Sequence, residues 1–321
     1  MNLNNKPLFR GIFLNVPRVR NRKFMVNFLF SDNGFILISI FIFLIGLSIG
    51  SFLNVVIFRL PKNSSVVYPP SSCPECSSKI KFYDNIPVLS YIILRGRCRS
   101  CNGKISPVYP AVELLTALLI YLLFLKYFYN TYFFYKINIS DIDYFKNYLS
   151  EQFNYLLACL IFILIIVPIA FIDLFNKIIP DVLNVLLIIS GFILNIFLLH
   201  KSFLFPLSGF LTAGLFFYFI ALFYEIIRKK EGLGGGDIKL IAGIGAFLGL
   251  RGVIFTIFGG AVFALFGFIL FFIFRKLIKK NPISSDFKIP FGPFLSLASI
   301  FYIFYGGFLT KVYCNFIKLS H

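Results

Sequence analysis

Long apolar runs, separated by shorter polar stretches, dominate the chain. Eight of them follow one another, at about residues 35–57, 110–133, 153–173, 181–200, 203–226, 237–250, 252–274 and 291–311. All but the short sixth run are long enough to cross roughly 30 Å of hydrocarbon as helices. In lipid the backbone must satisfy its own hydrogen bonds, so such runs predict α-helices. The pattern predicts an all-α polytopic membrane protein with about eight transmembrane helices.

Composition supports this prediction and suggests four parts. The chain is 59% hydrophobic and 14% charged, with a mean hydropathy of +0.87, which is too apolar for an ordinary soluble surface. We expect a basic N-terminal extension (1–34), a first transmembrane helix (35–57), a polar loop (58–109) and a membrane domain with the other seven helices (110–312). In the first run Gly46 and Gly50 are four residues apart, a spacing that lets another helix approach closely.

The distribution of basic residues predicts which side faces the cytoplasm. The loops that follow odd-numbered runs hold 18 of the 31 Lys and Arg, and without the N-terminal extension the balance is 18 to 7. The positive-inside rule therefore places these odd loops in the cytoplasm. The basic extension opposes that trend, which motivates the hypothesis that translation starts at Met25. The alternative is a disordered or surface-lying basic arm.

Four cysteines in the first odd loop have the spacing of a metal site. They form two C-x2-C pairs separated by 21 residues: Cys73, Cys76, Cys98 and Cys101. Two such pairs suit a tetrahedral thiolate site for zinc, in which each pair holds half of the metal. The alternative is two disulfides, which a reducing cytoplasm disfavours. Four cysteine ligands leave no open position, so we expect a structural zinc that lets the loop fold as a small cytoplasmic domain.

Two aspartates at the ends of apolar runs are candidates for catalysis. Asp173 ends the third run and Asp237 begins the sixth, so both reach the same face of the membrane. Ionisable groups at that depth are costly unless they have a function or a partner. Two carboxylates in a poorly solvated place cannot comfortably both ionise, so one is held protonated, which creates an acid/base pair. Such a pair can activate water for attack on a peptide carbonyl, as in an aspartyl protease.

Three glycines precede the second aspartate. Gly234, Gly235 and Gly236 leave no side chain in the way and can adopt conformations closed to other residues, so an extended substrate backbone could approach Asp237. Glycine-rich runs also bind phosphates, but no Gly-Lys-Ser/Thr signature is present. Among the other acids we expect Asp181 to cap the fourth helix. For Glu113, pairing with a loop cation and a chemical role are both open.

Five motifs in order resemble those of the prepilin peptidases, also called type IV leader peptidases. They are GSFLNVVIFRLP (50–61), the four cysteines with NIPVLSY between them and YPAVELL after them, FIDLFNKIIPD (171–181), EGLGGGDIKL (231–240) and IPFGPFL (289–295). The resemblance covers about residues 35–312. It implies a polytopic aspartyl protease of the bacterial inner membrane, with Asp173 and Asp237 as the catalytic pair and Asp237 in a Gly-x-Gly-Asp motif.

The resemblance also implies substrates and a second activity. Such enzymes cut the basic leader from type IV prepilins and from the pseudopilins of type II secretion, on the cytoplasmic side. Many members with the four-cysteine loop then methylate the new N-terminus with S-adenosylmethionine. We expect prepilin or pseudopilin substrates and contact with membrane lipid, and no nucleic-acid partner. IPFGPFL is open to two interpretations, a flank of the substrate next to the aspartates or a helix-breaking turn.

Two competing functions come from other classes. A secondary transporter or channel could use intramembrane aspartates as a proton relay, with the zinc loop as a regulatory module. No internal symmetry of the kind that transporters show is apparent in the sequence. A non-catalytic scaffold of pilus assembly is a further alternative, which the presence of both aspartates disfavours.

Overall fold

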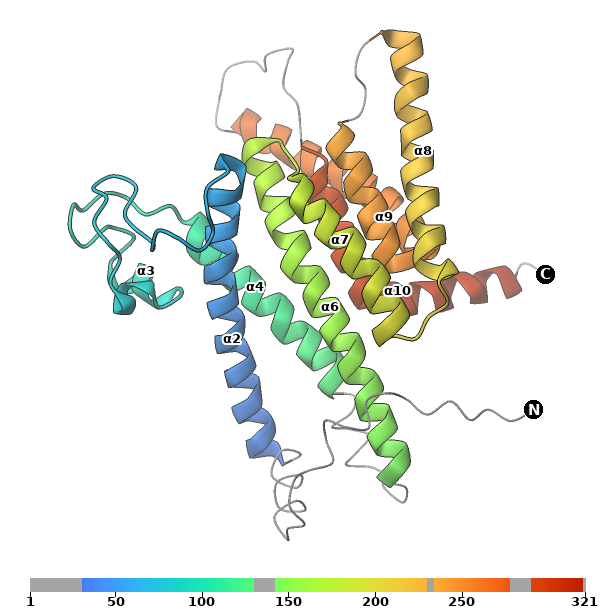
Figure 1. The fold of residues 1–321 in the computed structure, drawn as a ribbon, viewed down its shortest axis with the longest axis horizontal. Helices are drawn as coiled ribbons and strands as arrows, with labels where there is room; N and C mark the ends of the chain where they lie inside the picture. Colours follow the sequence, from blue (N-terminus) through green and yellow to red (C-terminus); the bar gives the residue numbers. More distant parts are fainter. Residues whose placement is uncertain (1–30, 130–141, 230–233, 278–289, 320–321) are drawn as a thin grey trace. The chain divides into compact units, whose positions relative to one another are not determined.

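The computed structural model describes residues 31–129, 142–229, 234–277 and 290–319, and Figure 1 gives the helix labels. The long helices are α2 (Asp32–Arg59), α4 (Val108–Phe124), α6 (Ile142–Asn176), α7 (Asp181–Ile193), α8 (Leu204–Arg228), α9 (Gly235–Leu277) and α10 (Gly292–Leu319). Single π-helical turns, Leu125–Tyr129 and Leu194–Leu198, extend α4 and α7. The loop between α2 and α4 contains the short helix α3 (Leu89–Ile93) and two 3-10 turns, Leu60–Lys62 and Phe82–Asn85.

The chain divides into two units, Met1–Phe41 and Ile42–His321. Of the first, only the beginning of α2 and the residue before it are described, so the rest of the basic extension and the possible start at Met25 lie outside the described residues. Most of α2, the polar loop and all later helices belong to the second unit. Within the described ranges the fold is all-α, with two isolated β-bridges in the loop, Ser72 with Lys79 and Arg97 with Lys104.

The prediction of about eight spans is confirmed in outline. In the described ranges six helices are long and apolar enough to cross a membrane when α9 is counted once, and the shorter apolar helix Gly292–Phe308 belongs to α10. Helix α9 is broken at Gly249, whose φ of 71° and ψ of −178° are not helical. Its two parts correspond to the predicted runs 237–250 and 252–274.

Neighbouring residues indicate that the two parts of α9 run in opposite directions. At the start of α9, a Cβ on Gly236 would lie 3.2 Å from the Cβ of Ile179, just after α6 ends. Near its other end, a Cβ on Gly267 would lie 2.7 Å from the ring of Phe294, in the first turn of α10. Gly292, two residues earlier, touches Asp173 near the end of α6. Both ends of α9 therefore lie on one face, and the chain turns back at Gly249.

A buried amide stabilises this turn. Asn195, fully buried after α7, donates hydrogen bonds through Nδ2 to the carbonyl oxygens of Ala246 (3.2 Å) and Phe247 (2.9 Å), and to that of Gly191 (2.8 Å). Carbonyls just before a break lose their helical partners, and unpaired buried groups are costly. The side chain of Asn195 therefore replaces backbone hydrogen bonds that are lost where α9 is interrupted.

The glycine pair in α2 is confirmed as a close helix contact. A Cβ on Gly46 would lie 2.7 Å from the Cα of Ala117, and one on Gly50 would lie 2.7 Å from the Cα of Glu113, both in α4. Only glycine permits the two backbones to approach this closely. This contact fixes the end of α2 against the start of α4, on either side of the polar loop.

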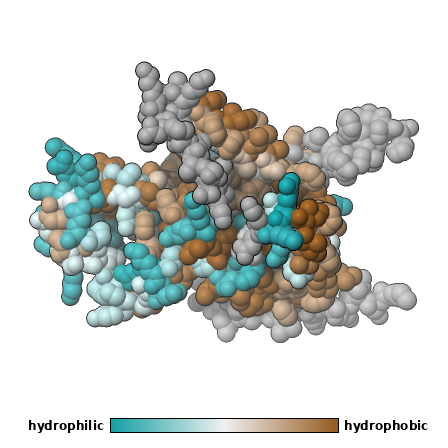
Figure 2. Space-filling model, turned by 90° about the horizontal axis from the view of Figure 1, so that it is seen from above, coloured by the Kyte–Doolittle hydropathy of each residue, from teal (hydrophilic) through white to brown (hydrophobic). Residues whose placement is uncertain are grey.

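The surface changes character between the helices and the loop. Helix α8 exposes Phe219, Phe223 and other large apolar side chains, as expected of a surface that faces lipid. Figure 2 shows brown, hydrophobic residues over the helices and teal, hydrophilic ones gathered where the loop lies. The helices pack around a continuous apolar core that includes Phe162, Ile169, Leu187 and Leu240. The described residues form the helices of a multi-pass membrane protein, with a polar loop domain between α2 and α4.

Candidate active site and metal centre

Asp173 lies in the last turn of α6, in the apolar core at the end of that helix. Only 5% of its surface is exposed. Its Oδ2 accepts a hydrogen bond of 3.0 Å from the backbone N–H of Gly292, at the start of α10. Its own carbonyl accepts the N–H of Lys177, where the chain takes a left-handed conformation and leaves the helix. The carboxylate is therefore held by one neutral donor at the N-terminus of a neighbouring helix.

Asp237 lies in the first turn of α9 and is half-buried. Its N–H donates to the carbonyl of Gly234 at 3.0 Å. The structure brings the two predicted aspartates together, since they are close enough for the charge of Asp173 to act on Asp237. Helices α6, α9 and α10 thus place two carboxylates from positions 64 residues apart in the sequence on the face where α6 ends and α9 begins.

The three glycines beside Asp237 have different surroundings. A Cβ on Gly234 would lie 3.3 Å from Asp237 Oδ2, and one on Gly236 would press on Ile179. A Cβ on Gly235 would meet no atom within 4 Å. None of the three has a positive φ, so the expectation of unusual backbone conformations is wrong here. What the glycines contribute in this structure is the absence of side chains beside the carboxylate. Glu231 to Leu233 of the same motif lie outside the described residues.

Two nearby residues were interpreted incompletely from the sequence. Asp181 does not cap α7, because Pro180 occupies the N-cap and no capping hydrogen bond forms; Asp181 instead forms an exposed ion pair with Lys239 at 2.7 Å. Gly292 was assigned only to a helix-breaking turn or a substrate flank. A Cβ on Gly292 would lie 2.6 Å from Asp173 Oδ2, so this glycine is needed for contact with the carboxylate. The sequence feature that could have indicated this contact is the Phe-Gly-Pro at residues 291–293, where the last apolar run begins.

The four cysteines come together as the spacing predicts. Their sulfur atoms all lie within 4.8 Å of one another, and the Sγ atoms of Cys73 and Cys101 are 3.9 Å apart. A tetrahedral zinc with Zn–S bonds of about 2.3 Å requires sulfur atoms about 3.8 Å apart. All four are free thiols, so the alternative of two disulfides is not what the structure contains. The cluster could hold a metal ion.

The two cysteine pairs are built in the same way. Cys73 N–H bonds to the Ser78 carbonyl, and Cys98 N–H bonds to the Gly103 carbonyl. The residue after each second cysteine, Ser77 or Asn102, has a φ of 56°, so each turn tightens at the equivalent position. Backbone N–H groups of Cys101 and Ser100 lower the pKa of the Cys98 thiol to about 6. Against a hydrogen bond from the Gly103 backbone that lowers it, desolvation and the other three thiols raise the pKa of Cys101 to about 12, so the thiols do not ionise independently.

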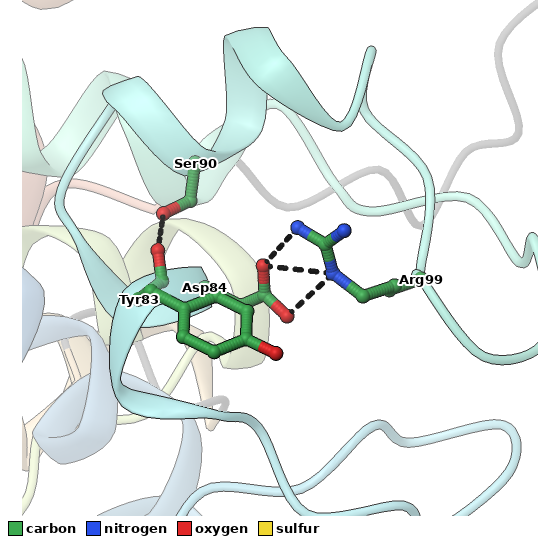
Figure 3. Close-up of polar contacts among 4 residues, drawn as sticks. All are labelled: Tyr83, Asp84, Ser90 and Arg99. Atoms are coloured by element: carbon green, nitrogen blue, oxygen red, sulfur yellow. Dashed lines mark hydrogen bonds and ion pairs between the residues drawn. The ribbon is translucent and has the colours of Figure 1, made fainter.

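An ion pair supports the loop beside the cysteines, as Figure 3 shows. Arg99 donates to both carboxylate oxygens of Asp84, at 2.6 Å from Nη2 and 2.9 Å from Nε, and holds the pKa of that carboxyl below its usual value. Ser90 Oγ donates to the carbonyl of Tyr83 at 3.1 Å. These contacts join the 3-10 turn before α3, α3 itself and the second cysteine pair into one small unit.

The chain is similar to known protein families and to curated enzymes. Residues 44–127 match the bacterial peptidase A24 N-terminal domain, and residues 158–269 match the type IV leader peptidase family. The prepilin leader peptidase/N-methyltransferase of Aeromonas hydrophila is 31% identical over 301 residues, which are 86% of this chain and 94% of that protein. The enzyme of the same name from Pseudomonas aeruginosa is 31% identical over 299 residues, covering 85% and 92%.

A similar protein of the same name from Myxococcus xanthus is 37% identical over 218 residues. This match covers 68% of the chain but only 58% of that relative. No solved structure matches the chain.

Proposed function

The chain belongs to the type IV leader peptidase family, and we propose that Asp173 and Asp237 are the catalytic dyad with which it removes the leader from type IV prepilins or pseudopilins. It is an enzyme of the prepilin leader peptidase/N-methyltransferase kind. One observation supports the dyad: the buried Asp173 lies within electrostatic range of Asp237. Gly235, near Asp237 in the sequence, has open space where a side chain would be.

The dyad provides both groups that peptide hydrolysis needs. One carboxylate takes a proton from water, the water oxygen attacks the scissile carbonyl, and the protonated partner donates a hydrogen bond to the developing oxyanion. The C–N bond then breaks, and the leaving amine receives a proton. The two groups titrate as a pair, so neither is assigned as the acid. The hydrogen bond from Gly292 N–H orients the Asp173 carboxylate.

The open space at Gly235 gives the substrate a route to the dyad. A scissile segment has to be extended to expose its carbonyl, and an extended backbone needs room for its own hydrogen-bonding groups. Gly235 exposes its backbone without a side chain, next to Asp237. The pilin segment after the leader is proposed to lie against the apolar helices, so that the cut falls at the membrane surface.

The cleavage site is proposed to face the cytoplasm, in the bacterial inner membrane. The end of α6 and the start of α9 belong to the odd loops, which hold 18 basic residues against 7 elsewhere when the N-terminal extension is left out. The leader of such a substrate is basic and stays on the same side. Membrane lipid and the pilin are the expected partners.

The four thiols are proposed to hold a structural zinc ion. Cys73, Cys76, Cys98 and Cys101 supply a complete tetrahedral set, so the metal has no open position for water or substrate. When bound, zinc links the two ends of a loop whose side chains are mostly exposed. The loop then holds its shape beside the start of α4. N-methylation with S-adenosylmethionine is proposed to follow cleavage, as the names of the relatives suggest.

Substitution of the dyad tests this function. The full chain, reconstituted in lipid, would be mixed with a type IV prepilin, and mass spectrometry would give the N-terminus of the product. Asp173→Asn and Asp237→Asn should each abolish leader removal while the protein still inserts. Asp181→Asn is the matched control, because this exposed acid lies at the same face and, among the described residues, pairs with Lys239. Normal cleavage by either dyad variant would refute the assignment.

A further inference from the structure

A cavity of about 500 Å³ lies between the end of α2, the start of α4 and the cysteine loop. Its volume is within the roughly 300–1,000 Å³ typical of small-molecule sites. Asn54 and Phe58 of α2 line it, together with Tyr109 and Glu113 at the start of α4 and Val88 and Tyr91 from the loop. Cys73 and Cys98 also line it, so the cavity borders the cluster of four thiols, whereas neither aspartate of the dyad lines it.

Two of the five sequence motifs meet in this cavity, the second of them through both NIPVLSY and YPAVELL. Asn54 comes from GSFLNVVIFRLP, Val88 from NIPVLSY, and Tyr109 and Glu113 from YPAVELL. Asn54 Nδ2 donates to the Tyr109 carbonyl at 3.0 Å, and Val88 N–H donates to Glu113 Oε2 at 2.7 Å. The ring of Phe58 stacks on that of Tyr109 with centroids 4.7 Å apart. The peptidase chemistry uses none of these residues.

Glu113 lacks a positive partner. It is 8% exposed and lies within a membrane-spanning helix. The donors around its carboxylate are neutral: the Val88 N–H and the side chains of Ser51 and Asn54. Arg59, Lys79, Arg99 and Lys104 also line the cavity, but among the described residues none of them forms an ion pair with Glu113. A desolvated carboxylate with neutral partners alone is costly, so a ligand with a positive charge would be stabilised there.

Asn54, which also lines the cavity, has a buried acceptor without a partner in the described part of the chain. Asn54 is 3% exposed, and its Oδ1 has no hydrogen-bond partner among the described residues. Buried acceptors of this kind usually find a donor. The cavity thus offers an acceptor and an anion beside two stacked aromatic rings. These groups suit a ligand that combines a planar base, hydrogen-bond donors and positive charge.

We propose that this cavity is the methyl-transfer site and that Glu113 is its catalytic carboxylate, binding the ammonium group of the newly cut pilin. The inference rests on the proposed function. S-adenosylmethionine supplies a methyl group attached to a positively charged sulfur, and Asn54 and the Phe58–Tyr109 pair are the residues that hold this donor. Helix α4 starts after the first odd loop and α6 ends before the next one, so the predicted topology places both of these helix ends on the same side of the membrane.

The carboxylate performs the step that the amine cannot perform alone. An ammonium nitrogen has no free electron pair, so Glu113 first accepts one of its protons. The nitrogen then forms a bond to the methyl carbon while the carbon–sulfur bond breaks, and the sulfur keeps the electron pair of that bond. Glu113 afterwards releases its proton to solvent. The Val88 N–H, bonded to Oε2, orients the carboxylate for this transfer.

Glu113→Gln in the full reconstituted chain tests the proposal. A synthetic pilin peptide without a leader separates methylation from cleavage. We expect cleavage of intact prepilin within twofold of the parent, and methylation of the cut peptide at least 100-fold slower at pH 7. Free α-amines titrate near pH 8, so the variant should regain about tenfold relative to the parent by about pH 9. Glu225→Gln, an exposed glutamate on α8, is the matched control.

Binding of the methyl donor provides a measurement independent of activity. Isothermal titration calorimetry with S-adenosylmethionine should show at least tenfold weaker binding by Asn54→Leu and binding within threefold of the parent by Glu113→Gln. Parental methylation by Glu113→Gln, a loss with no recovery at high pH, or unchanged donor binding by Asn54→Leu would each overturn the assignment. A parent that cuts prepilin and methylates nothing would instead refute the methyltransferase part of the proposed function.

Discussion

Gly292→Ala should slow leader cleavage by placing one methyl group against the proposed dyad. The new Cβ would lie 2.6 Å from Asp173 Oδ2, whereas real Cβ contacts essentially never fall below 3.0 Å, so the carboxylate or α10 must move by at least 0.4 Å. The hydrogen bond from residue 292 N–H, now 3.0 Å, is then lengthened or lost. Hydrogen bonds to charged groups contribute about 1.5–3 kcal/mol, and about 1.4 kcal/mol corresponds to a tenfold change in rate. We therefore expect kcat/KM for cleavage to fall about 10- to 100-fold.

The assay is the initial rate of leader removal by purified enzyme in lipid nanodiscs. Gly307→Ala is the matched control, because it makes the same change in the same helix and its Cβ would meet nothing within 4 Å. The thermal unfolding temperature of both variants shows whether the helix still packs. A Gly292→Ala enzyme that is stable and cuts as fast as Gly307→Ala would show that this hydrogen bond does not orient a catalytic group.

Three further predictions concern the metal, the α9 turn and the dyad. Cys98→Ser should reduce zinc content from one ion per chain to almost none by elemental analysis, whereas Cys159→Ser, in the buried core, should leave it unchanged. Asn195→Leu should lower the free energy of unfolding by about 1–3 kcal/mol, because it leaves carbonyls at the α9 break unpaired. Asn184→Leu should not lower it, since both polar atoms of the Asn184 amide are buried without partners in the described ranges. Thermal unfolding of the two variants distinguishes these outcomes. Cleavage by the parent should follow a bell-shaped pH profile, and a flat profile would contradict a carboxylate pair.

The sequence predicted the spans well because lipid imposes a simple rule. A backbone in hydrocarbon must be helical, so apolar length alone identified the eight segments. Runs 237–250 and 252–274 were predicted as separate, although no polar loop lies between them and the first is too short to cross the membrane. The helix is interrupted at Gly249. The Asn195 amide, which donates hydrogen bonds to the carbonyls before this break, lies 54 residues earlier in the sequence. No local pattern could reveal that pairing.

The candidate site was predicted only in part, for a related reason. Asp173 and Asp237 could be identified because acids are rare in the chain, and the four thiols because their spacing is specific. The contact of Gly292 with Asp173 joins residues 119 positions apart and depends on a missing side chain. Glu113 could not be interpreted from sequence because its significance comes from what surrounds it, a cavity and neutral donors, which only the folded chain displays.

The two proposed sites complement each other in charge. An uncut prepilin has a neutral amide at the scissile bond, so it offers nothing positive at that nitrogen to the Glu113 carboxylate. Cleavage at the dyad converts that amide into an ammonium group near the edge of the membrane, where an isolated charge is costly. Pairing this new cation with Glu113, which has only neutral donors, relieves both groups. The order of the two reactions then needs no separate regulatory element, because cleavage creates the ammonium group that the Glu113 carboxylate binds before methylation.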